Sequence, residues 1–203
     1  MSNSEVVGIT GGIGTGKSFV ASIIRSLGFM VLDSDQIAHR ILTCDQNAID
    51  KLCHFFGEGI VKKDGAIDRK ALGTLVFGHP DQLEKLNKIL DPFLRQTILA
   101  ELKSAPKPVF IEIPLLYELH YENYVDQVIV VFADDRIALD RIQKRDHLDF
   151  ATANKKLCAQ LPIKEKIKRT KYIVDTTQSN VLEQVIAILQ KIDLMKEDKS
   201  EMS

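Results

Sequence analysis

The chain has 203 residues, of which 45% are hydrophobic and 27% charged, and this apolar share is enough for a globular domain with a buried core. Its 27 Lys and Arg residues against 28 Asp and Glu residues give a formal net charge of −1, which excludes a strong overall attraction to nucleic acid or to an anionic membrane. The three cysteines form no C-x-x-C pair and no apolar stretch nears the roughly 20 residues that span a bilayer, so we expect a soluble cytoplasmic protein without a disulfide framework.

Five short runs rich in valine and isoleucine predict five β-strands. In chain order they are residues 6–10, 29–33, 109–113, 128–132 and 172–175. Each run is followed by a longer stretch with helical spacing, and several of the runs are continuously apolar rather than alternating. Such strands are typical of a parallel α/β sheet that helices cover on both faces, with right-handed crossovers.

The segment between the second and third strands, residues 34–106, carries no strand signal and predicts helices instead. Two apolar faces with helical spacing occur in it: Ile49, Leu52, Cys53 and Phe56, and then Leu83, Leu86, Leu90, Leu94, Ile98 and Leu102. Asp68 reads as a helix N-cap. Asp91 followed by Pro92 predicts that one helix ends there and another begins, with aspartate as the cap and proline at its first position.

A glycine-rich motif follows the first predicted strand and precedes a predicted helix. Residues 11–18, GGIGTGKS, match the phosphate-loop pattern G-x-x-x-x-G-K-[ST] in the context that the pattern requires. Main-chain N–H groups and the helix N-terminus would bind the phosphates, Lys17 would reach the β- and γ-phosphates, and the Ser18 hydroxyl would bind Mg²⁺. The residues expected to bind the nucleotide are Gly12, Ile13, Gly14, Thr15, Gly16, Lys17, Ser18 and Phe19.

A phosphate loop alone does not separate a GTPase from a kinase. The string nearest to the guanine-binding N-K-x-D element, residues 87–91, has the wrong spacing and lies in a predicted helix, which disfavours a GTPase. A kinase needs a carboxylate beside its acceptor, and Asp33 and Asp35 lie at the carboxyl end of the second strand, where ligands of α/β sheets collect. Each of the two also fits the simpler interpretation of a helix N-cap.

Cations that could close over a phosphoryl group follow the fourth strand. Arg136, Arg141 and Arg145 lie on a predicted helix, and the last two, four residues apart, share a face. Interleaved aspartates favour the alternative of a solvated, salt-bridged helix face. Further on, residues 155–171 hold seven basic residues against Glu165 alone, which suits a polyanionic substrate or a solvated face. The segment has no interleaved aromatic residue, which disfavours nucleic acid.

Taken together, five strings make the chain resemble the dephospho-CoA kinase family over nearly its whole length. They are ITGGIGTGKS (9–18), LDSD (32–35), DGAIDRKALGTLVF (64–77), IPLLYE (113–118) and RIQKRD (141–146). The resemblance implies ATP-dependent phosphorylation of the ribose 3′-hydroxyl of dephospho-coenzyme A, the final step of coenzyme A synthesis, with ATP and Mg²⁺ as cofactors. It implies no nucleic-acid or membrane partner, and a monomer or small homo-oligomer.

The family is similar in fold to the nucleoside monophosphate kinases. The resemblance therefore implies a three-layer P-loop NTPase fold with a five-stranded parallel sheet, in a single domain over residues 1–203. Its core would be residues 5–33, 107–135 and 171–195, its helical coenzyme A-binding region 34–106, and its lid 136–170, called here the lid segment.

The resemblance also assigns roles to individual residues. Asp33 matches the catalytic aspartate and, with Ser18, a metal ligand; Lys17, Arg141 and Arg145 match catalytic cations. Substrate-binding residues would be Asp33, Asp35, Arg69, Phe77, Pro114, Leu115, Leu116 and Glu118.

At three places the chain departs from the family pattern. Asp91 stands where the family usually has histidine, and residues 176–178 lack the usual asparagine and glycine near the adenine end of ATP. Glu112, often aspartate in relatives, is either a second metal-organising carboxylate or a strand cap. Two other functions stay open: a related kinase for another small hydroxyl or nucleotide, and a non-enzymatic nucleotide-binding switch or RNA-binding accessory.

Overall fold

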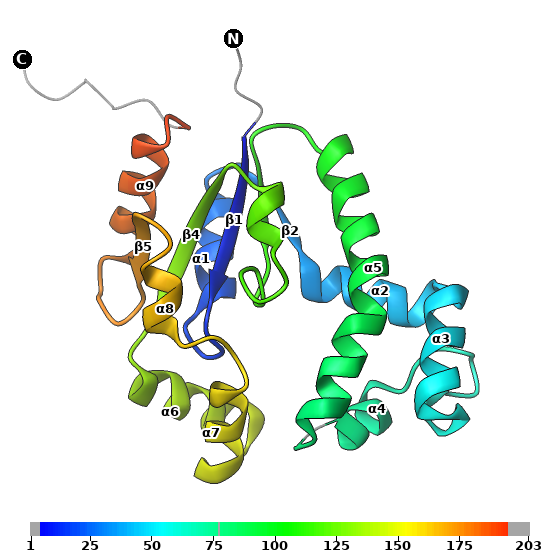
Figure 1. Ribbon diagram of the computed structural model, residues 1–203. Helices are drawn as coiled ribbons and strands as arrows, with labels where there is room; N and C mark the ends of the chain where they lie inside the picture. The colour runs from blue at the N-terminus through cyan, green and yellow to red at the C-terminus, as the bar shows by residue number, and fades with distance from the viewer. Residues whose placement is uncertain (1–4, 77, 195–203) are drawn as a thin grey trace, which may run out of the picture. The chain divides into compact units, whose positions relative to one another are not determined.

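The computed structural model describes residues 5–76 and 78–194. It has a five-stranded sheet of order β2-β3-β1-β4-β5 (Figure 1). The strands are β1 (Val6–Gly11), β2 (Met30–Asp33), β3 (Val109–Glu112), β4 (Gln127–Phe132) and β5 (Tyr172–Asp175). β1 pairs in parallel with β3 and β4, and β4 with β5. The predicted α/β fold with a five-stranded parallel sheet is confirmed, because each predicted strand matches an observed one to within a residue at either end.

The register of the central strands decides which residues meet at the carboxyl edge of the sheet. Ile9 of β1 is opposite Glu112 at the end of β3, and Gly11 is opposite Val131 near the end of β4. Parallel strands place their carboxyl ends at the same edge. Glu112 therefore lies at the edge from which the chain leaves β1 and enters residues 11–18.

Two helices cover one face of this sheet. They are α1 (Lys17–Ser26), drawn behind the sheet in Figure 1, and α9 (Val181–Lys191). The buried residues of each helix recur every three or four positions, as an amphipathic helix requires. They pack with the strands into one core, in which Val20, Ala21, Ile24, Val185 and Leu189 are at most 1% exposed.

The lid segment folds as three helices between β4 and β5. They are α6 (Asp135–Asp146), α7 (Phe150–Cys158) and the short α8 (Ile163–Ile167). α6 packs on α7, and α8 packs on β4, in front of the sheet in Figure 1. Asp149 begins α7 by accepting a hydrogen bond from the Thr152 N–H.

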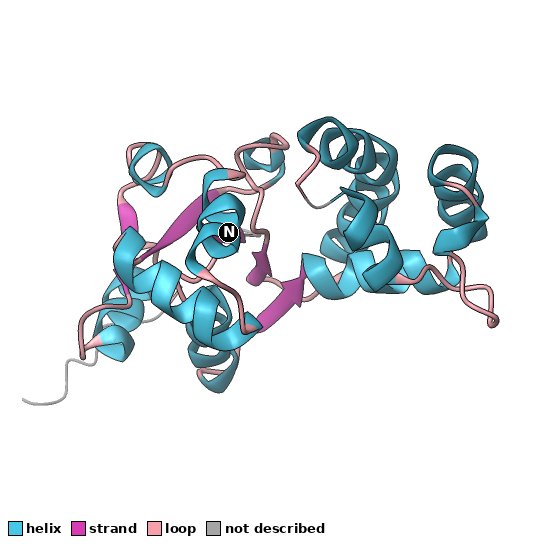
Figure 2. Cartoon of the chain, turned by 90° about the horizontal axis from the view of Figure 1, so that it is seen from below, coloured by secondary structure: helices cyan, strands magenta, loops and turns pink. Residues whose placement is uncertain are grey.

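Residues 33–105 form a compact unit of their own, separate from the sheet unit that comprises the described parts of Met1–Leu32 and Pro106–Ser203. Helices make up nearly all of it, coloured cyan in Figure 2. They are α2 (Ser34–Cys44), α3 (Gln46–Phe56), η1 (Glu58–Ile60), α4 (Arg69–Val76) and α5 (Pro80–Ser104). The unit has its own apolar core: Leu42, Ile49, Leu52, Ile60, Ile67, Leu72 and Val76.

Aspartates begin several of these helices, as their residue type favours. Asp45 accepts a hydrogen bond from Ala48 N–H at the start of α3. Asp68 accepts hydrogen bonds from Lys70 N–H and Ala71 N–H at the start of α4, which confirms the predicted cap.

The predicted helix break at Asp91 and Pro92 is wrong. α5 runs unbroken from Pro80 to Ser104 with Pro92 inside it. Asp91 does not cap a helix; its carboxylate accepts hydrogen bonds from Arg95 Nη2 and Nε at 2.9 and 3.2 Å. Leu83, Leu86 and Leu90 on one side of the proline pack against the apolar core of the unit, and Ile98 on the other side is fully buried. Burial of both halves offsets the hydrogen bond that proline removes.

Within residues 5–76 and 78–194, the structure contains no helix that is both long enough and apolar enough to cross a membrane.

Candidate active site

The phosphate loop, residues 11–18, joins β1 to α1, and two of its glycines adopt backbone angles that side chains disfavour. Gly14 has φ +77° and Gly16, the N-cap of α1, has φ +90°. A Cβ on Gly14 would also lie only 2.5 Å from the Ala138 carbonyl oxygen of α6. Thr15 closes the loop by donating its hydroxyl hydrogen to Gly12 O at 2.8 Å. Glycine and threonine thus give the loop the shape that the motif predicts.

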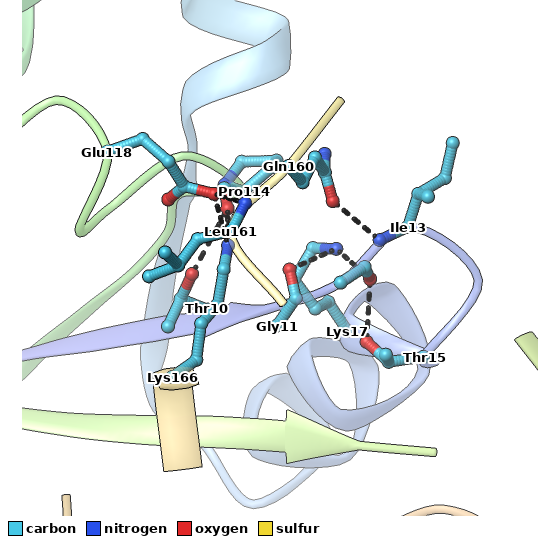
Figure 3. Close-up of polar contacts among 11 residues, drawn as sticks. Thr10, Gly11, Ile13, Thr15, Lys17, Pro114, Glu118, Gln160, Leu161 and Lys166 are labelled. Atoms are coloured by element: carbon cyan, nitrogen blue, oxygen red, sulfur yellow. Dashed lines mark hydrogen bonds and ion pairs between the residues drawn. The ribbon is translucent and has the colours of Figure 1, made fainter. Parts of the chain in front are cut away.

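Lys17 lies inside this loop rather than in solvent. Its side chain is nearly buried, and its Nζ donates to the carbonyl oxygens of Gly12 at 2.9 Å and Gly11 at 3.3 Å (Figure 3). A buried ammonium group needs such partners, because an uncompensated charge is costly to remove from water. These two carbonyl oxygens hold the Lys17 ammonium group at the loop.

Ser18 and Glu112 meet where β1 and β3 end. Ser18 Oγ donates to Glu112 Oε1 at 3.1 Å, and the Glu112 side chain is buried. Within the described residues, no cluster of three or more His, Cys, Asp or Glu side chains could hold a metal ion. One hydroxyl and one carboxylate are, however, the kind of protein ligands that Mg²⁺ uses when phosphate oxygens and water complete its shell. The pair therefore fits a nucleotide-borne Mg²⁺.

Asp33 is the last residue of β2 and the N-cap of α2. Its Oδ1 accepts hydrogen bonds from Asp35 N–H at 2.9 Å and Gln36 N–H at 3.1 Å, and its Oδ2 accepts one from Gln36 Nε2 at 3.1 Å. Of the two aspartates that fit an N-cap, Asp33 is the cap of α2, while Asp35 is exposed in the first turn of the helix. An ionised carboxylate has about four lone-pair positions, so the cap leaves Oδ2 able to accept a further hydrogen bond.

The two candidate arginines of α6 have different partners, although they lie one turn apart. Arg141 Nη1 donates to Thr176 Oγ1 at 2.8 Å and to Gly14 O of the phosphate loop at 3.3 Å, and its Nη2 donates to Thr176 O at 3.0 Å. Arg145 pairs instead with Asp146 at 2.7 Å and is exposed, as is Arg136. Arg145 and Lys156, which also pairs with Asp146, lower the pKa of that carboxyl far below its usual range.

Thr176 follows β5 and connects three elements. Its hydroxyl donates to Thr15 O of the phosphate loop at 2.6 Å and accepts from Arg141, and its N–H donates to Phe132 O at the end of β4. This residue replaces an asparagine of the family pattern. The structure shows that threonine still links the loop to the segment after β5.

An open pocket of about 720 Å³ lies beside the phosphate loop. Phe19, Ile23 and Leu182 are apolar residues in its wall, and Gln178 and Ser179 are polar ones. Phe19, a predicted nucleotide-binding residue, is 56% exposed there, while its N–H donates to Gly16 O within the first turn of α1. The pattern of the loop does not identify the other wall residues, because they come from distant segments.

Residues 114–118, called here the acceptor turn, follow β3. Pro114 O accepts a hydrogen bond from Thr10 Oγ1 at 3.2 Å, which ties the turn to β1. Pro114, Leu115 and Glu118 are partly exposed, whereas the Leu116 side chain is fully buried in the sheet unit. Leu116 therefore supports the turn from within.

The remaining candidate residues lie elsewhere. Arg69 is the first residue of α4 and is exposed in the unit of residues 33–105. Phe77 lies outside the residues that the structure describes. The sheet unit thus brings together the phosphate loop, Glu112, Arg141 and Thr176, while Asp33, Asp35 and Arg69 belong to the other unit.

Two polar residues near the loop were missed by the sequence-based reasoning. Gln160 Oε1 accepts the Ile13 N–H at 2.8 Å, and the buried Lys166 pairs with Glu118. A signal for Lys166 exists: it lies three residues after the buried Ile163, and residues three apart share a helix face. Nothing comparable marks Gln160, which lies between α7 and α8.

The parallel sheet, the glycine loop before α1, the inward lysine and the Ser18–Glu112 pair together define a nucleotide-binding protein of the phosphate-loop α/β class. Comparison with known proteins narrows the class. A family model described as dephospho-CoA kinase matches residues 5–181.

Individual relatives agree with this match over nearly their whole length. The dephospho-CoA kinase of Geobacillus kaustophilus is 37% identical over 196 residues, which cover 94% of this chain and 98% of the relative. That of Enterococcus faecalis is 41% identical over 175 residues, covering 85% and 88%. The solved structure of dephospho-CoA kinase from Campylobacter jejuni is 33% identical with a TM-score of 0.68, covering 92% of this chain and 96% of that one. This chain belongs to the dephospho-CoA kinase family and is a phosphotransferase.

Proposed function

We propose that this protein transfers the γ-phosphoryl group of ATP to the ribose 3′-hydroxyl of dephospho-coenzyme A, which yields coenzyme A and ADP. The observation that carries the proposal is the phosphate loop with Lys17 inside it and Ser18 on Glu112, in a chain that matches the family over residues 5–181. Loop, cation and metal-ligand pair are the parts that phosphoryl transfer needs on the donor side.

The nucleotide would occupy the loop and the pocket beside it. Main-chain N–H groups at the N-terminus of α1 and the Lys17 ammonium stabilise the negative charge of the phosphates. The apolar wall of Phe19, Ile23 and Leu182 suits the faces of a nucleobase, and Gln178 and Ser179 can hydrogen-bond its edge. The composition of this pocket wall supports ATP as the donor.

Mg²⁺ would be held by the Ser18 hydroxyl, with Glu112 accepting the hydrogen bond of that hydroxyl or of a metal-bound water. When bound with the nucleotide, it would supply positive charge that offsets the negative charge of the phosphates. Glu112 can do what the more usual aspartate does, because its carboxylate already reaches Ser18.

On the acceptor side, Asp33 would orient the 3′-hydroxyl. The hydroxyl oxygen forms a bond to the γ-phosphorus, the bond from that phosphorus to the β–γ bridging oxygen breaks, and ADP leaves with the bonding electrons. The hydroxyl proton passes to the Asp33 carboxylate and then to water. Because the transition state is loose, Asp33 acts mainly by holding the hydroxyl oxygen in line with the γ-phosphorus. It takes the hydroxyl proton only late in the reaction. The helix cap fixes the carboxylate for this task.

Arg141 supplies a guanidinium group at the loop, where it can turn from the Gly14 carbonyl oxygen to phosphate oxygens. We propose Arg145 as a second such cation, which must first leave Asp146. We further propose that the protein works in the cytoplasm, where the free thiols Cys44, Cys53 and Cys158 are kept reduced.

Acceptor profiling tests the proposal. The protein is incubated with ATP and Mg²⁺ and, in parallel, with dephospho-coenzyme A, nucleosides, nucleoside monophosphates and shikimate, and ADP and phosphorylated product are quantified by mass spectrometry. We expect dephospho-coenzyme A to react best, with one ADP per coenzyme A. Faster phosphorylation of another acceptor would make the protein a kinase of different specificity. ADP release without any phosphorylated acceptor would indicate a nucleotide-binding switch.

A further inference from the structure

Lys166 is a charged residue where the fold leaves no contact with water. Its side chain is 0% exposed, whereas Lys164 of the same short helix and Lys168, which follows that helix, are exposed. Its Nζ donates to Glu118 Oε1 at 2.9 Å and to Pro114 O at 2.8 Å. Burial lowers the pKa of Lys166, and Glu118 opposes that shift by favouring the charged form. A pair of this kind is weak evidence for stability and is better explained by what it holds in place.

The pair holds two segments together. Glu118 Oε1 also accepts the Leu161 N–H at 2.9 Å, so it fixes the connection between α7 and α8. Pro114 O, the second acceptor of Lys166, also accepts the Thr10 hydroxyl from the end of β1. Figure 3 shows these contacts converging on Pro114 and Glu118 beside the phosphate loop. Lys166 thus joins the acceptor turn and the lid segment to the strand that leads into the loop.

Gln160, the residue before Leu161, reaches the phosphate loop itself. Its Oε1 accepts the Ile13 N–H at 2.8 Å (Figure 3). A main-chain N–H can only donate, so the carbonyl side of the Gln160 amide faces Ile13 and the NH₂ side is turned away from it. Ile13 follows Gly12, whose carbonyl oxygen binds Lys17 Nζ, the group that reaches the β- and γ-phosphates of a bound nucleotide. Gln160 is therefore at the outer-phosphate end of the loop.

We propose that Gln160 binds the terminal phosphate of the nucleotide, and that Glu118 and Lys166 are the positioning residues that hold it there. On binding, a terminal phosphate oxygen takes the Ile13 N–H in place of Gln160 Oε1, and the Gln160 NH₂ group donates to the phosphate. The proposal rests on nucleotide binding at the phosphate loop, but not on the identity of the acceptor.

Calorimetric titration of ATP and of ADP, without acceptor, tests the role of Gln160. Gln160→Glu keeps an oxygen acceptor for Ile13 N–H but places a negative charge beside the terminal phosphate. We expect the Kd of ATP to rise at least about 10-fold and that of ADP less than about 3-fold, with the ATP effect shrinking at high salt. Gln160→Leu, which removes the NH₂ donor without adding charge, should raise the Kd of ATP about 3-fold to 10-fold.

The matched control is Gln190→Glu, which adds the same charge on α9 and should leave both Kd values unchanged. Equal shifts for ATP and ADP in Gln160→Glu, or shifts no larger than in the control, would overturn the contact with the terminal phosphate. A wild-type protein that binds ATP but does not phosphorylate dephospho-coenzyme A would refute the proposed acceptor and leave this titration valid.

The positioning role is tested by separating geometry from stability. Lys166→Met leaves the Glu118 carboxylate without its buried cation and should lower the melting temperature. Adding Glu118→Gln removes the second charge. It should recover most of the lost melting temperature, because a neutral pair can replace a buried ion pair. We expect the double variant to keep a raised Kd for ATP and a kcat reduced at least about 10-fold. Lys164→Met, on the exposed side of α8, is the control for loss of a lysine. A double variant with wild-type kcat and wild-type Kd for ATP would reduce the pair to a structural role.

Discussion

The phosphate loop and the lid segment both contribute to the proposed nucleotide site, but by different kinds of contact. In the loop, main-chain angles at Gly14 and Gly16 and local hydrogen bonds within residues 11–18 make the binding surface. In the lid segment, single long side chains reach it, and their partners lie far along the chain: Arg141 on Thr176, and Gln160 on Ile13. A binding surface made of backbone is encoded locally, whereas one made of side chains depends on the whole fold.

The largest expected effect concerns Lys17, the one cationic side chain in a loop whose other phosphate-binding groups belong to the backbone. Lys17→Ala should lower kcat at least about 10³-fold, because it removes the charge that stabilises the transferring phosphoryl group. Steady-state ADP release measures the loss. Lys168→Ala, which removes an exposed lysine paired with Glu165, is the control. If Lys17→Ala retained a tenth of the wild-type kcat, the loop backbone alone would account for donor-side catalysis.

A second prediction concerns Asp33, where a local cap and a proposed catalytic role coincide. Asp33→Asn should lower kcat about 10²-fold or more, because an amide takes up the proton of the attacking hydroxyl group poorly. It should change the melting temperature little, since asparagine is as good an N-cap as aspartate. The matched control is Asp45→Asn at the start of α3, which makes the same change in a cap alone. Equal kcat values for the two variants would assign Asp33 to capping.

The third prediction separates the two arginines of α6. Arg141→Lys should raise the KM for ATP and lower kcat/KM about 10-fold, because lysine cannot reproduce the two-pronged contact with Thr176 and Gly14. Arg145→Lys should change kcat/KM less, since the hydrogen bonds of Arg145 to its neighbour Asp146 lie within the lid segment. Steady-state kinetics with ATP varied compare the two. A larger loss in Arg145→Lys would show that Arg145 is the principal phosphate-binding arginine.

The smallest expected effect is on stability within the lid segment. Asp146 pairs with Arg145 and Lys156, which lower its folded-state pKa below the unfolded value. The contribution of the Asp146 carboxylate to stability is therefore present above about pH 4 and is lost as the pH falls through the folded-state pKa. Asp146→Asn should cost about 1 kcal/mol or less at pH 7, since Arg145 is exposed.

Urea unfolding of both proteins at pH 7 and at pH 3 measures this difference. We expect the difference in free energy of unfolding between wild type and Asp146→Asn to be smaller at pH 3 than at pH 7. A difference in free energy of unfolding that is the same at both pH values would show that the packing of Asp146, and not its charge, stabilises the segment.

The same contrast explains how far the sequence could predict the structure. Each of the five strands and the phosphate loop depends on a contiguous run of residues, and all were predicted within a residue or so of their observed bounds. Asp68 was predicted as a cap because its partners, Lys70 and Ala71, are adjacent. Pro92 was misread because the contacts that keep α5 continuous come from other helices of its unit.

The candidate site divides in the same way. Spacing alone could not tell that Arg141 lies on the loop while Arg145 pairs with Asp146, because Thr176 is 35 residues from Arg141. Lys166 looked like one more solvated lysine in a basic segment, and only the fold shows that it is buried. The roles of the individual site residues stay predictions that the variants above would test.

The helical unit of residues 33–105 has an apolar core built from its own residues. None of these core residues belongs to the apolar core of the sheet unit. We therefore expect that side chains of this separate core can be replaced, by evolution or by design, without repacking the core of the sheet unit. If this unit binds the acceptor alcohol, as the family resemblance implies, recognition of new alcohols can diverge there while the phosphate loop is inherited intact.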